Sequence, residues 1–306
     1  MPHRPRRSSR AVRPRAVGPA RMVWWPRCVP SPCSSPCMKC CPRIRAGRRW
    51  AACRPVDCRP VAPSNLPDAV LWDMDGTIVD TEQYWQTAQL NLLADHGLPP
   101  LTEEQELGMV GSSMADASEF FARLGVDLAP GEIVDHMNST VMASILAELA
   151  WRPGALELLG ALHAAGVPNA LVTNSTRVLA DAVVSTLDTP LFAIVIAGDE
   201  VENGKPHPEP YLRAAAQLGV APGRCVAVED SRRGLEAARA AGCATIGIPH
   251  GQTLEAHHAH LVTATLEGIT PEALGELIEQ VARETTQREN AHTAADAAPA
   301  ESEAQL

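Results

Sequence analysis

Three aspartates stand close together where a short apolar run ends. Asp73, Asp75 and Asp80 follow the four apolar residues at 69–72, which predict a buried strand. Their carboxylates repel one another, so this position requires a cation or a use for the charge. One carboxylate there can attack phosphorus, and another two residues on, emerging on the same side, can transfer protons. Taken alone, Asp75-Gly76 also fits an ordinary turn.

Polar side chains end or follow the next apolar runs of the chain as well. These residues are Thr173, Asn174, Lys205, Glu229 and Asp230. Each has a plain interpretation, because hydroxyls and carboxylates commonly cap helices and a lone loop lysine is usually solvated. A hydroxyl, a lysine and two acidic clusters coinciding at four strand ends instead favour phosphoryl transfer with one Mg²⁺. Asp73 and Asp230 can supply hard oxygen ligands, while Lys205 and Thr173 can balance charge on phosphoryl oxygens.

The elements that must position these residues alternate between short apolar runs and helical patterns. The expected strands are residues 69–72, 168–174, 192–198, 224–230 and 243–249. Single helices between short apolar strands predict βαβ units and a parallel sheet buried on both faces. We therefore expect an α/β fold, a Rossmann-like doubly wound sheet. Ligands bind at the carboxyl ends of the strands in such sheets, where the polar residues lie.

One stretch interrupts this alternation. Residues 82–150 hold about four helical patterns and no strand pattern, which is too much for a loop and predicts a small helical second domain. The catalytic core would then comprise residues 66–81 and 151–282. Residues 283–306 are polar and lack a hydrophobic period, so we expect a disordered tail.

The first 65 residues differ from the rest in charge and composition. They hold fourteen arginines, one lysine and one aspartate, a net charge of +14; because the whole chain carries −10, residues 66–306 carry −24. An acidic body is a poor nucleic-acid partner. The segment is Arg-, Pro- and Cys-rich without a hydrophobic period, which predicts a disordered extension. A targeting peptide is a weaker interpretation, because its prolines oppose an amphipathic helix.

Seven of the nine cysteines fall in that extension. Cys37 and Cys40 have the spacing of a zinc half-site, and Cys53 and Cys58 could complete four ligands, but the irregular spacing disfavours zinc. No disulfide framework or signal peptide is evident in the folded body, so we expect a cytoplasmic protein. No apolar run is long enough to span a membrane, so no membrane association is expected. The sequence makes no prediction of oligomeric state.

Together, the motifs identify the chain as a member of the haloacid dehalogenase (HAD) superfamily, which it resembles in order over about residues 68–281. The stretches "DMDGTIVD", "LVTNS", "KP" at 205–206 and "VEDS" are similar to the four family motifs. The resemblance implies that Asp73 is the nucleophile and Asp75 the acid/base, with its backbone carbonyl offered to Mg²⁺. It also implies phosphate contacts from Thr173, the Asn174 amide and Lys205, and magnesium ligation by Asp73, Asp230 and, directly or through water, Glu229. The helical insertion resembles a C1-type cap.

Within the superfamily, the chain resembles the branch of sugar-phosphate phosphatases, phosphoglycolate phosphatases and β-phosphoglucomutase. The mutases carry a histidine twelve residues after the nucleophile, where this chain has Trp85, as hexitol-phosphate phosphatases often do. Trp85 is equally well explained as a core residue of the first insertion helix. Gly111 and Ser112 occupy a loop where relatives place substrate contacts. The resemblance thus implies a magnesium-dependent phosphatase for a small phosphorylated metabolite, a sugar or polyol phosphate.

Three alternatives differ from this hypothesis. An L-2-haloacid dehalogenase shares the fold but lacks an acid at the position of Asp75. A β-phosphoglucomutase-like mutase would share the aspartyl-phosphate step and differ in what attacks next. A non-catalytic binding protein on the same scaffold should have lost at least one charged site residue, whereas all are present here.

Overall fold

The computed structural model describes residues 65–296 of the 306-residue chain, and the side chains of residues 65–290. The predictions made for residues 1–64 lie outside the described residues, including the disordered extension and the disfavoured zinc site at Cys37, Cys40, Cys53 and Cys58. So does the prediction for residues 297–306.

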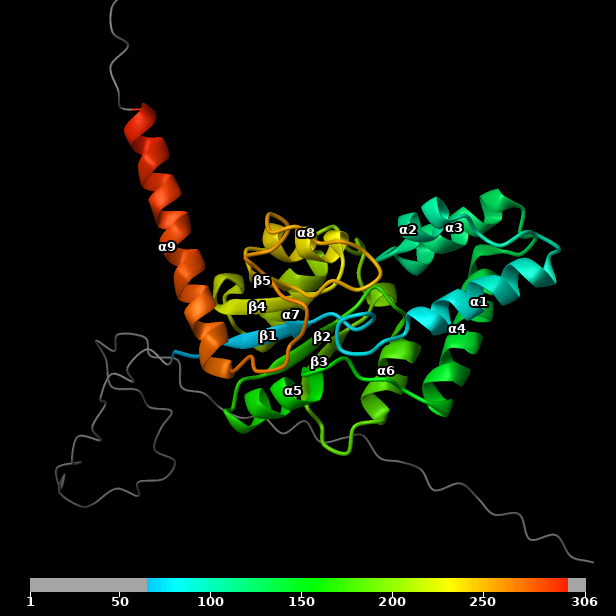
Figure 1. The fold of residues 1–306 in the computed structure, drawn as a ribbon, viewed down its shortest axis with the longest axis horizontal. Coiled ribbons are helices and arrows are strands. Elements are labelled where there is room, and N and C mark those ends of the chain that lie inside the picture. Colours follow the sequence, from blue (N-terminus) through cyan, green and yellow to red (C-terminus); the bar gives the residue numbers. More distant parts are fainter. Residues whose placement is uncertain (1–64, 297–306) are drawn as a thin grey trace, which may run out of the picture. The chain divides into compact units, whose positions relative to one another are not determined.

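Strands and helices alternate along the described chain (Figure 1). The strands are β1 (Ala69–Trp72), β2 (Asn169–Val172), β3 (Phe192–Ile196), β4 (Cys225–Glu229), β5 (Ala244–Gly247) and β6 (Leu261–Val262). The helices of the insertion are α1 (Glu82–Asp95), α2 (Glu103–Met109), α3 (Met114–Leu124) and α4 (Pro130–Ala147). The others are α5 (Ala155–Ala164), α6 (Arg177–Ser185), α7 (Glu209–Leu218), α8 (Arg232–Ala240) and α9 (Pro271–Asp296). Two 3₁₀ turns span Gly198–Glu200 and Pro222–Arg224.

The strands form one parallel sheet in the order β3-β2-β1-β4-β5-β6. The chain leaves β1 toward β2 on one side and later returns to pair β4 on the other, which is the doubly wound topology predicted from the sequence. At the carboxyl end of β1, Trp72 pairs with Leu171 of β2 and Val228 of β4. The residues that directly follow these three central strands therefore lie next to one another at the carboxyl ends of the strands.

The two faces of the sheet are covered by different helices. Val70 and Trp72 of β1 belong to a cluster shared with α5, α6 and α9, whereas Ala69 and Leu71 join a cluster with α7 and α8. This alternation follows from the two-residue period of a strand. Figure 1 shows α5 and α6 on one side of the sheet and α8 on the other.

Two sheet predictions need correction at the edges. The inner strands β1, β2, β4 and β5 are buried throughout, but only Ile196 of the edge strand β3 is buried. β3 is an edge strand with a neighbouring strand on one side only, so its side chains are less covered than those of the inner strands, and the expected burial of both faces is not observed there. The two-residue strand β6 was not predicted, because Leu261–Val262 is too short to show a period.

Four helices and no strand lie between Glu82 and Ala147, as the sequence predicts. Helix α4 contacts α1, α3 and the core helix α6. Buried side chains of the insertion, among them Leu92, Phe121 and Val141, belong to the same hydrophobic cluster as Trp72. Division of residues 82–150 into a separate domain therefore stays a prediction.

Two short linkers join the helical insertion to the sheet. They pair in antiparallel fashion, with a bridge between Val79 and Trp151. The Asp80 N–H donates to the Ala150 carbonyl at 2.8 Å, and the Arg152 N–H donates to the Ile78 carbonyl at 2.9 Å. The entry and exit of the insertion are thus held side by side.

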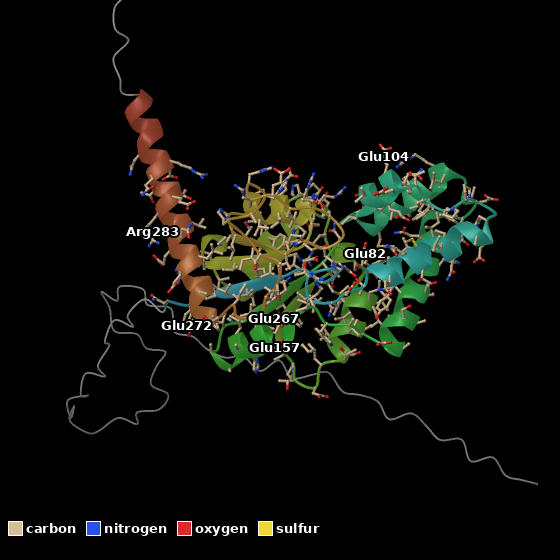
Figure 2. All side chains as sticks on the ribbon, in the orientation of Figure 1. Glu82, Glu104, Glu157, Glu267, Glu272 and Arg283 are labelled. Atoms are coloured by element: carbon tan, nitrogen blue, oxygen red, sulfur yellow. The ribbon has the colours of Figure 1, made fainter. Side chains whose placement is uncertain are left out.

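The predicted disordered tail is wrong for its first part, because α9 continues through Asp296 (Figure 2, where Glu272 and Arg283 lie along it). Leu274, Leu277 and Ile278 anchor the helix on the sheet. Beyond them the sequence is rich in Ala, Glu, Gln and Arg, which propagate a helix once it has been nucleated by packing. Among residues 65–296, no helix is both long and apolar enough to cross a bilayer; the cytoplasmic location stays a prediction.

Candidate active site

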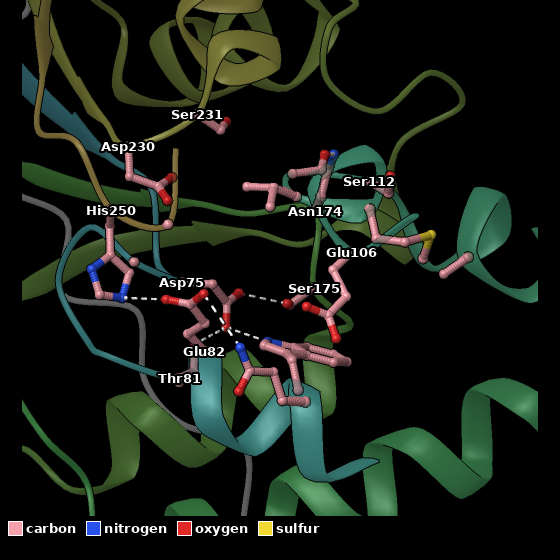
Figure 3. Close-up of a pocket in the computed structure, with 18 of the residues that line it drawn as sticks. Asp75, Thr81, Glu82, Glu106, Ser112, Asn174, Ser175, Asp230, Ser231 and His250 are labelled. Atoms are coloured by element: carbon pink, nitrogen blue, oxygen red, sulfur yellow. Dashed lines mark hydrogen bonds and ion pairs between the residues drawn. The ribbon is translucent and has the colours of Figure 1, made fainter. Parts of the chain in front are cut away.

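A cavity of about 300 Å³ lies between the carboxyl edge of the sheet and helices of the insertion (Figure 3). Two groups of residues line it, and we name each end after its source. The sheet end includes Asp73, Asp75, Thr173, Lys205 and Asp230. The helix end, from α1 and α2, includes Glu82, Trp85, Gln86, Gln89, Glu103 and Glu106. The volume suits one small molecule.

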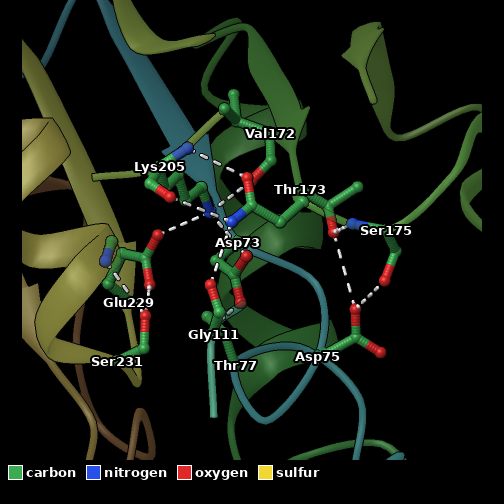
Figure 4. A network of polar contacts seen from close by, with 12 residues as sticks. Asp73, Asp75, Thr77, Gly111, Val172, Thr173, Ser175, Lys205, Glu229 and Ser231 are labelled. Atoms are coloured by element: carbon green, nitrogen blue, oxygen red, sulfur yellow. Dashed lines mark hydrogen bonds and ion pairs between the residues drawn. The ribbon is translucent and has the colours of Figure 1, made fainter. Parts of the chain in front are cut away.

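Asp73 directly follows β1 and is fixed by two donors (Figure 4). Its Oδ1 accepts from the Lys205 ammonium at 2.6 Å, and its Oδ2 accepts from the Thr77 hydroxyl at 3.1 Å. Burial raises the pKa of Asp73 to about 7, together with repulsion from Glu229 and Asp75, although Lys205 acts in the opposite direction. A cation beside this carboxylate would favour its ionised, nucleophilic form.

Lys205 is buried and uses all three ammonium hydrogens. Besides Asp73, its Nζ donates to the Glu229 carboxylate at 2.5 Å and to the Val172 carbonyl at 2.8 Å. Burial lowers the pKa of Lys205, but the nearby Asp73 and Glu229 carboxylates outweigh it, so the pKa is raised overall. Lys205 is therefore a permanent positive charge at the sheet end.

Glu229, the last residue of β4, is held by donors on both oxygens. Oε1 accepts from Lys205 and from the Tyr211 hydroxyl, and Oε2 accepts from the Ser231 hydroxyl at 3.1 Å. Gly234 makes room for it, since a Cβ there would lie 2.0 Å from this carboxylate. Tyr211 was not predicted from the sequence, where its only signal is a single hydroxyl on the apolar face of α7.

Asp230 differs from Glu229 in lacking donors. It is buried, yet among the described residues none donates a hydrogen bond to its carboxylate. Burial, with repulsion from Asp73 and Glu229, raises its pKa well above the usual range. Gly76, at φ +75°, allows the backbone after β1 to approach closely, because a Cβ there would lie 2.3 Å from Asp230 Oδ2.

These three acids form a candidate cation site. Ligand atoms of Asp73, Glu229 and Asp230 all lie within 4.8 Å of one another. An uncompensated buried carboxylate is costly unless a cation accompanies it. Asp73 and Asp230 line the cavity, whereas Glu229 is fully buried and does not. Asp73 and Asp230 are therefore the better direct ligands, and Glu229 suits a water-mediated role. Oxygen-only donors fit Mg²⁺ or another hard divalent ion.

Asp75 has a different environment from Asp73, although only one residue separates them. Its Oδ1 accepts from the Thr81 hydroxyl at 2.6 Å and from the Trp85 indole N–H at 2.9 Å. Its Oδ2 accepts from the Ser175 hydroxyl at 2.6 Å and from the Thr173 hydroxyl at 3.5 Å. Neutral donors from both the sheet and the insertion therefore hold Asp75 (Figures 3 and 4).

The residues that follow β2 connect the site to the insertion. The Thr173 hydroxyl accepts from the Ser175 N–H at 3.0 Å. The Asn174 side chain donates to the Gly111 carbonyl at 2.9 Å and accepts from the Lys205 N–H at 3.0 Å. The side chain is used in this way, and the Asn174 backbone N–H is a separate candidate donor to an anion. Phosphate binding by Thr173, Asn174 and Lys205 stays a prediction.

The candidates from the insertion all line the cavity, but in different ways. Trp85 contacts Asp75, as described above, so it is more than a core residue. Gly111 has φ +73°, and a Cβ there would lie 3.1 Å from Ser231, so this loop packs tightly on the core. Ser112 lines the cavity beside it. Their contacts with a substrate stay predictions.

His250 lines the cavity and was not predicted as a site residue from the sequence. Its Nε2 lies 3.0 Å from Asp80 Oδ1 and 3.3 Å from Glu82 Oε2, and its Nδ1 accepts from the Arg152 guanidinium at 2.9 Å. It thereby joins both linkers of the insertion, and it gives Asp80 a partner other than the cation site. Its position after β5 was the only available signal.

Comparison with known proteins agrees with this geometry. The family model for "haloacid dehalogenase-like hydrolase" matches residues 67–242. The chain is 32% identical over 204 residues to phosphoglycolate phosphatase of Shigella boydii serotype 4, covering 60% of this chain and 81% of that one. It is 33% identical over 213 residues to hexitol phosphatase A of Escherichia coli K12, covering 65% and 92%.

Solved structures show the same arrangement of the chain. CbbY from Rhodobacter sphaeroides, determined with phosphate, superposes with a TM-score of 0.63 at 27% identity, covering 68% of this chain and 99% of that one. β-Phosphoglucomutase from Clostridium difficile superposes with a TM-score of 0.64 at 22% identity, covering 71% and 100%. At 22% identity, the similarity to β-phosphoglucomutase shows a shared fold and nothing more.

Proposed function

We infer that this chain, which belongs to the haloacid dehalogenase-like hydrolase family, is a phosphoric monoester hydrolase acting on a small phosphorylated metabolite. The observation that carries the proposal is the contrast between Asp73 and Asp75. Asp73 lies against Lys205 and the candidate cation site, whereas Asp75 lies among neutral donors facing the helix end. Two carboxylates with different environments can take two roles.

In the proposed mechanism, an Asp73 oxygen attacks phosphorus and the bond from phosphorus to the ester oxygen breaks. Asp75 gives its proton to the departing oxygen, so an alcohol leaves and an aspartyl-phosphate remains. Asp75 then takes a proton from water, whose oxygen attacks phosphorus and displaces Asp73, releasing inorganic phosphate. The geometry that supports this scheme is the position of both carboxylates on one cavity.

Lys205 would balance charge on the phosphoryl group, and the loop after β2 would donate hydrogen bonds to it. The Lys205 ammonium lies at the sheet end, and Thr173 and the backbone N–H of Asn174 lie beside it. Donors preorganised around the phosphoryl oxygens stabilise charge that develops during transfer. Mg²⁺ held by Asp73, Asp230 and the Asp75 carbonyl, with Glu229 through water, would supply further charge neutralisation.

The helical insertion, residues 82–150, would act as a cap that covers the substrate. Its residues form the helix end of the cavity, and its entry and exit are paired at Val79 and Trp151. The cavity volume of about 300 Å³ and its amide and carboxylate groups suit a sugar or polyol phosphate. The core would comprise residues 66–81 and 151–282.

One test separates the phosphatase from the mutase alternative. Trp85 donates its indole N–H to Asp75 but has no group that can take up a proton, so it cannot relay one. We therefore expect Asp75 to activate water. The enzyme is given β-glucose 1-phosphate with a trace of glucose 1,6-bisphosphate and Mg²⁺. Inorganic phosphate formed in proportion to substrate lost supports a phosphatase, while conversion to glucose 6-phosphate without free phosphate indicates a mutase.

The same assay tests the non-catalytic alternative. If neither product forms, a panel of sugar and polyol phosphates is examined for release of inorganic phosphate in the presence of Mg²⁺. A binding protein would release none from any of them. A phosphatase would release phosphate from at least one, and Asp73→Asn would abolish that release.

A further inference from the structure

The helix end of the cavity is acidic on its wall. Glu82 lies in α1, and Glu103 and Glu106 lie in α2; all three line the cavity together with the amides Gln86 and Gln89. Figure 3 shows Glu106 extending into the cavity toward the Asp75 side. A molecule in this part of the cavity therefore meets carboxylates and amides, alongside apolar side chains such as Leu107, Met109 and Met137.

The basic side chains that line the cavity are already occupied. Among the described residues these are Lys205 and His250. The Lys205 ammonium donates to two carboxylates and a carbonyl at the sheet end. His250 faces Asp80 and Glu82 through Nε2 and accepts from Arg152 through Nδ1. Neither offers a free positive charge to a second anionic group at the helix end.

The position of the leaving group follows from the proposed function, on which this inference rests. Asp75 must face the ester oxygen, and Trp85 binds Asp75 from the helix end. The alcohol beyond that oxygen must therefore extend along Trp85 toward α2, where Glu103 and Glu106 line the cavity.

We propose that Glu103 and Glu106 act as a charge filter: they admit phosphate monoesters whose leaving alcohol is uncharged and reject those whose leaving group carries a carboxylate. A polyol hydroxyl can donate a hydrogen bond to a glutamate, whereas a carboxylate can only accept. The desolvation of a ligand carboxylate is also not offset by any attraction here, because it would be repelled by the glutamate carboxylates. The charge filter therefore makes phosphoglycolate a poor substrate of this chain, although one relative is named phosphoglycolate phosphatase.

The chain contains a matched control for this proposal. Glu104 belongs to the same helix as Glu103 and Glu106 but does not line the cavity. Figure 2 shows it at the outer side of the insertion. Glu104→Gln removes the same charge from the same helix, so any effect of net charge or helix stability alone appears in this variant too.

The experiment compares two substrates that differ at one carbon. Sorbitol 6-phosphate and 6-phosphogluconate have the same six-carbon acyclic chain, ending in a CH₂OH group and a carboxylate respectively. We expect kcat/KM to favour sorbitol 6-phosphate by at least about tenfold, as expected for one like charge at ~6 Å with partial screening. Glu106→Gln should narrow this ratio severalfold, Glu103→Gln should narrow it less or equally, and Glu104→Gln should leave it unchanged.

Ionic strength gives a second readout that requires no substitution. Because Glu103 and Glu106 are exposed, raising salt from about 0.05 to 0.5 M should narrow the ratio in the native enzyme. Equal turnover of both substrates, or a ratio that Glu104→Gln changes as much as Glu106→Gln does, overturns the filter. Such a result leaves the phosphatase proposal intact, whereas failure to hydrolyse any phosphate monoester would contradict the phosphatase proposal itself.

Discussion

The sheet end and the helix end of one cavity are built in different ways. At the sheet end, Asp73, Lys205 and Glu229 are buried and hold one another through short hydrogen bonds. At the helix end, Glu103 and Glu106 are exposed and make no described hydrogen bond through their carboxylates. The first arrangement fixes positions before any ligand arrives, and the second leaves side chains free to meet one. Under the proposed function, the reaction would depend on buried and hydrogen-bonded side chains, and the choice of substrate on exposed ones.

This comparison predicts that substitutions at the sheet end have the largest effects. Asp73→Asn should lower kcat by more than about a thousandfold, because an amide cannot form the aspartyl-phosphate. Phosphate release under saturating substrate measures it, with Asp188→Asn as the control at an exposed position. Retention of more than about a thousandth of the rate would argue against covalent catalysis by Asp73.

The two acids at the end of β4 should respond in opposite ways. Asp230→Asn should weaken Mg²⁺ binding by at least about a hundredfold, while raising the metal-free melting temperature, because it removes an unpaired buried carboxylate. Glu229→Gln breaks a buried contact with Lys205 and should destabilise the protein by roughly 3 kcal/mol.

Thermal unfolding with EDTA and with excess Mg²⁺ measures both effects. The native enzyme should gain stability from Mg²⁺ and lose all activity in EDTA. If Asp230→Asn gained as much stability from Mg²⁺ as the native chain, Asp230 would not be a ligand. Full activity in metal-free buffer would indicate dehalogenase-like chemistry instead.

Trp85 stands between the two ends, and its substitution should have an intermediate effect. Trp85→Phe removes the N–H donated to Asp75 while keeping an aromatic ring, and should lower kcat by about tenfold. Tyr84→Phe, one residue earlier, loses a hydrogen bond to the Glu148 carbonyl and does not touch Asp75. The pH dependence of kcat should shift in Trp85→Phe alone; equal shifts in both variants would assign Trp85 a merely structural role.

The smallest effect is expected outside the cavity. Removal of residues 1–63 should leave turnover and melting temperature unchanged within error, because their composition predicts no packed structure. Activity and thermal unfolding of the shortened and full-length chains measure it. A stoichiometric zinc ion that is lost with the segment would contradict the prediction.

The contrast between the two ends also explains what the sequence could predict. Asp73, Thr173 and Asp230 directly follow buried strands, so a parallel sheet brings them to one edge and their proximity follows from topology. The fold class and family were predictable for the same reason. Which of Asp230 and Glu229 lacks donors was not predictable, because two donors to Glu229, Lys205 and Tyr211, come from segments about twenty residues earlier in the chain.

Contacts that depend on side-chain direction were beyond the sequence. His250 meets Asp80 across 170 residues of chain, and no spacing rule brings them together. Glu103, Glu104 and Glu106 are indistinguishable as a charge run, yet Glu104 alone of these three does not line the cavity. The helical extension of α9 beyond residue 283 was missed because a polar composition suits both a free tail and a helix nucleated elsewhere.

The Asn174 side chain links the helical insertion to the loop that carries Lys205. Its amide simultaneously contacts the Gly111 carbonyl of the insertion and both backbone polar groups of Lys205. Departure of the α2–α3 loop would strip one partner from a buried amide while the lysine remains in place. Under the proposed function, opening of the insertion would be coupled through this amide to Lys205, so substitution of Asn174 is expected to change the rate of product release.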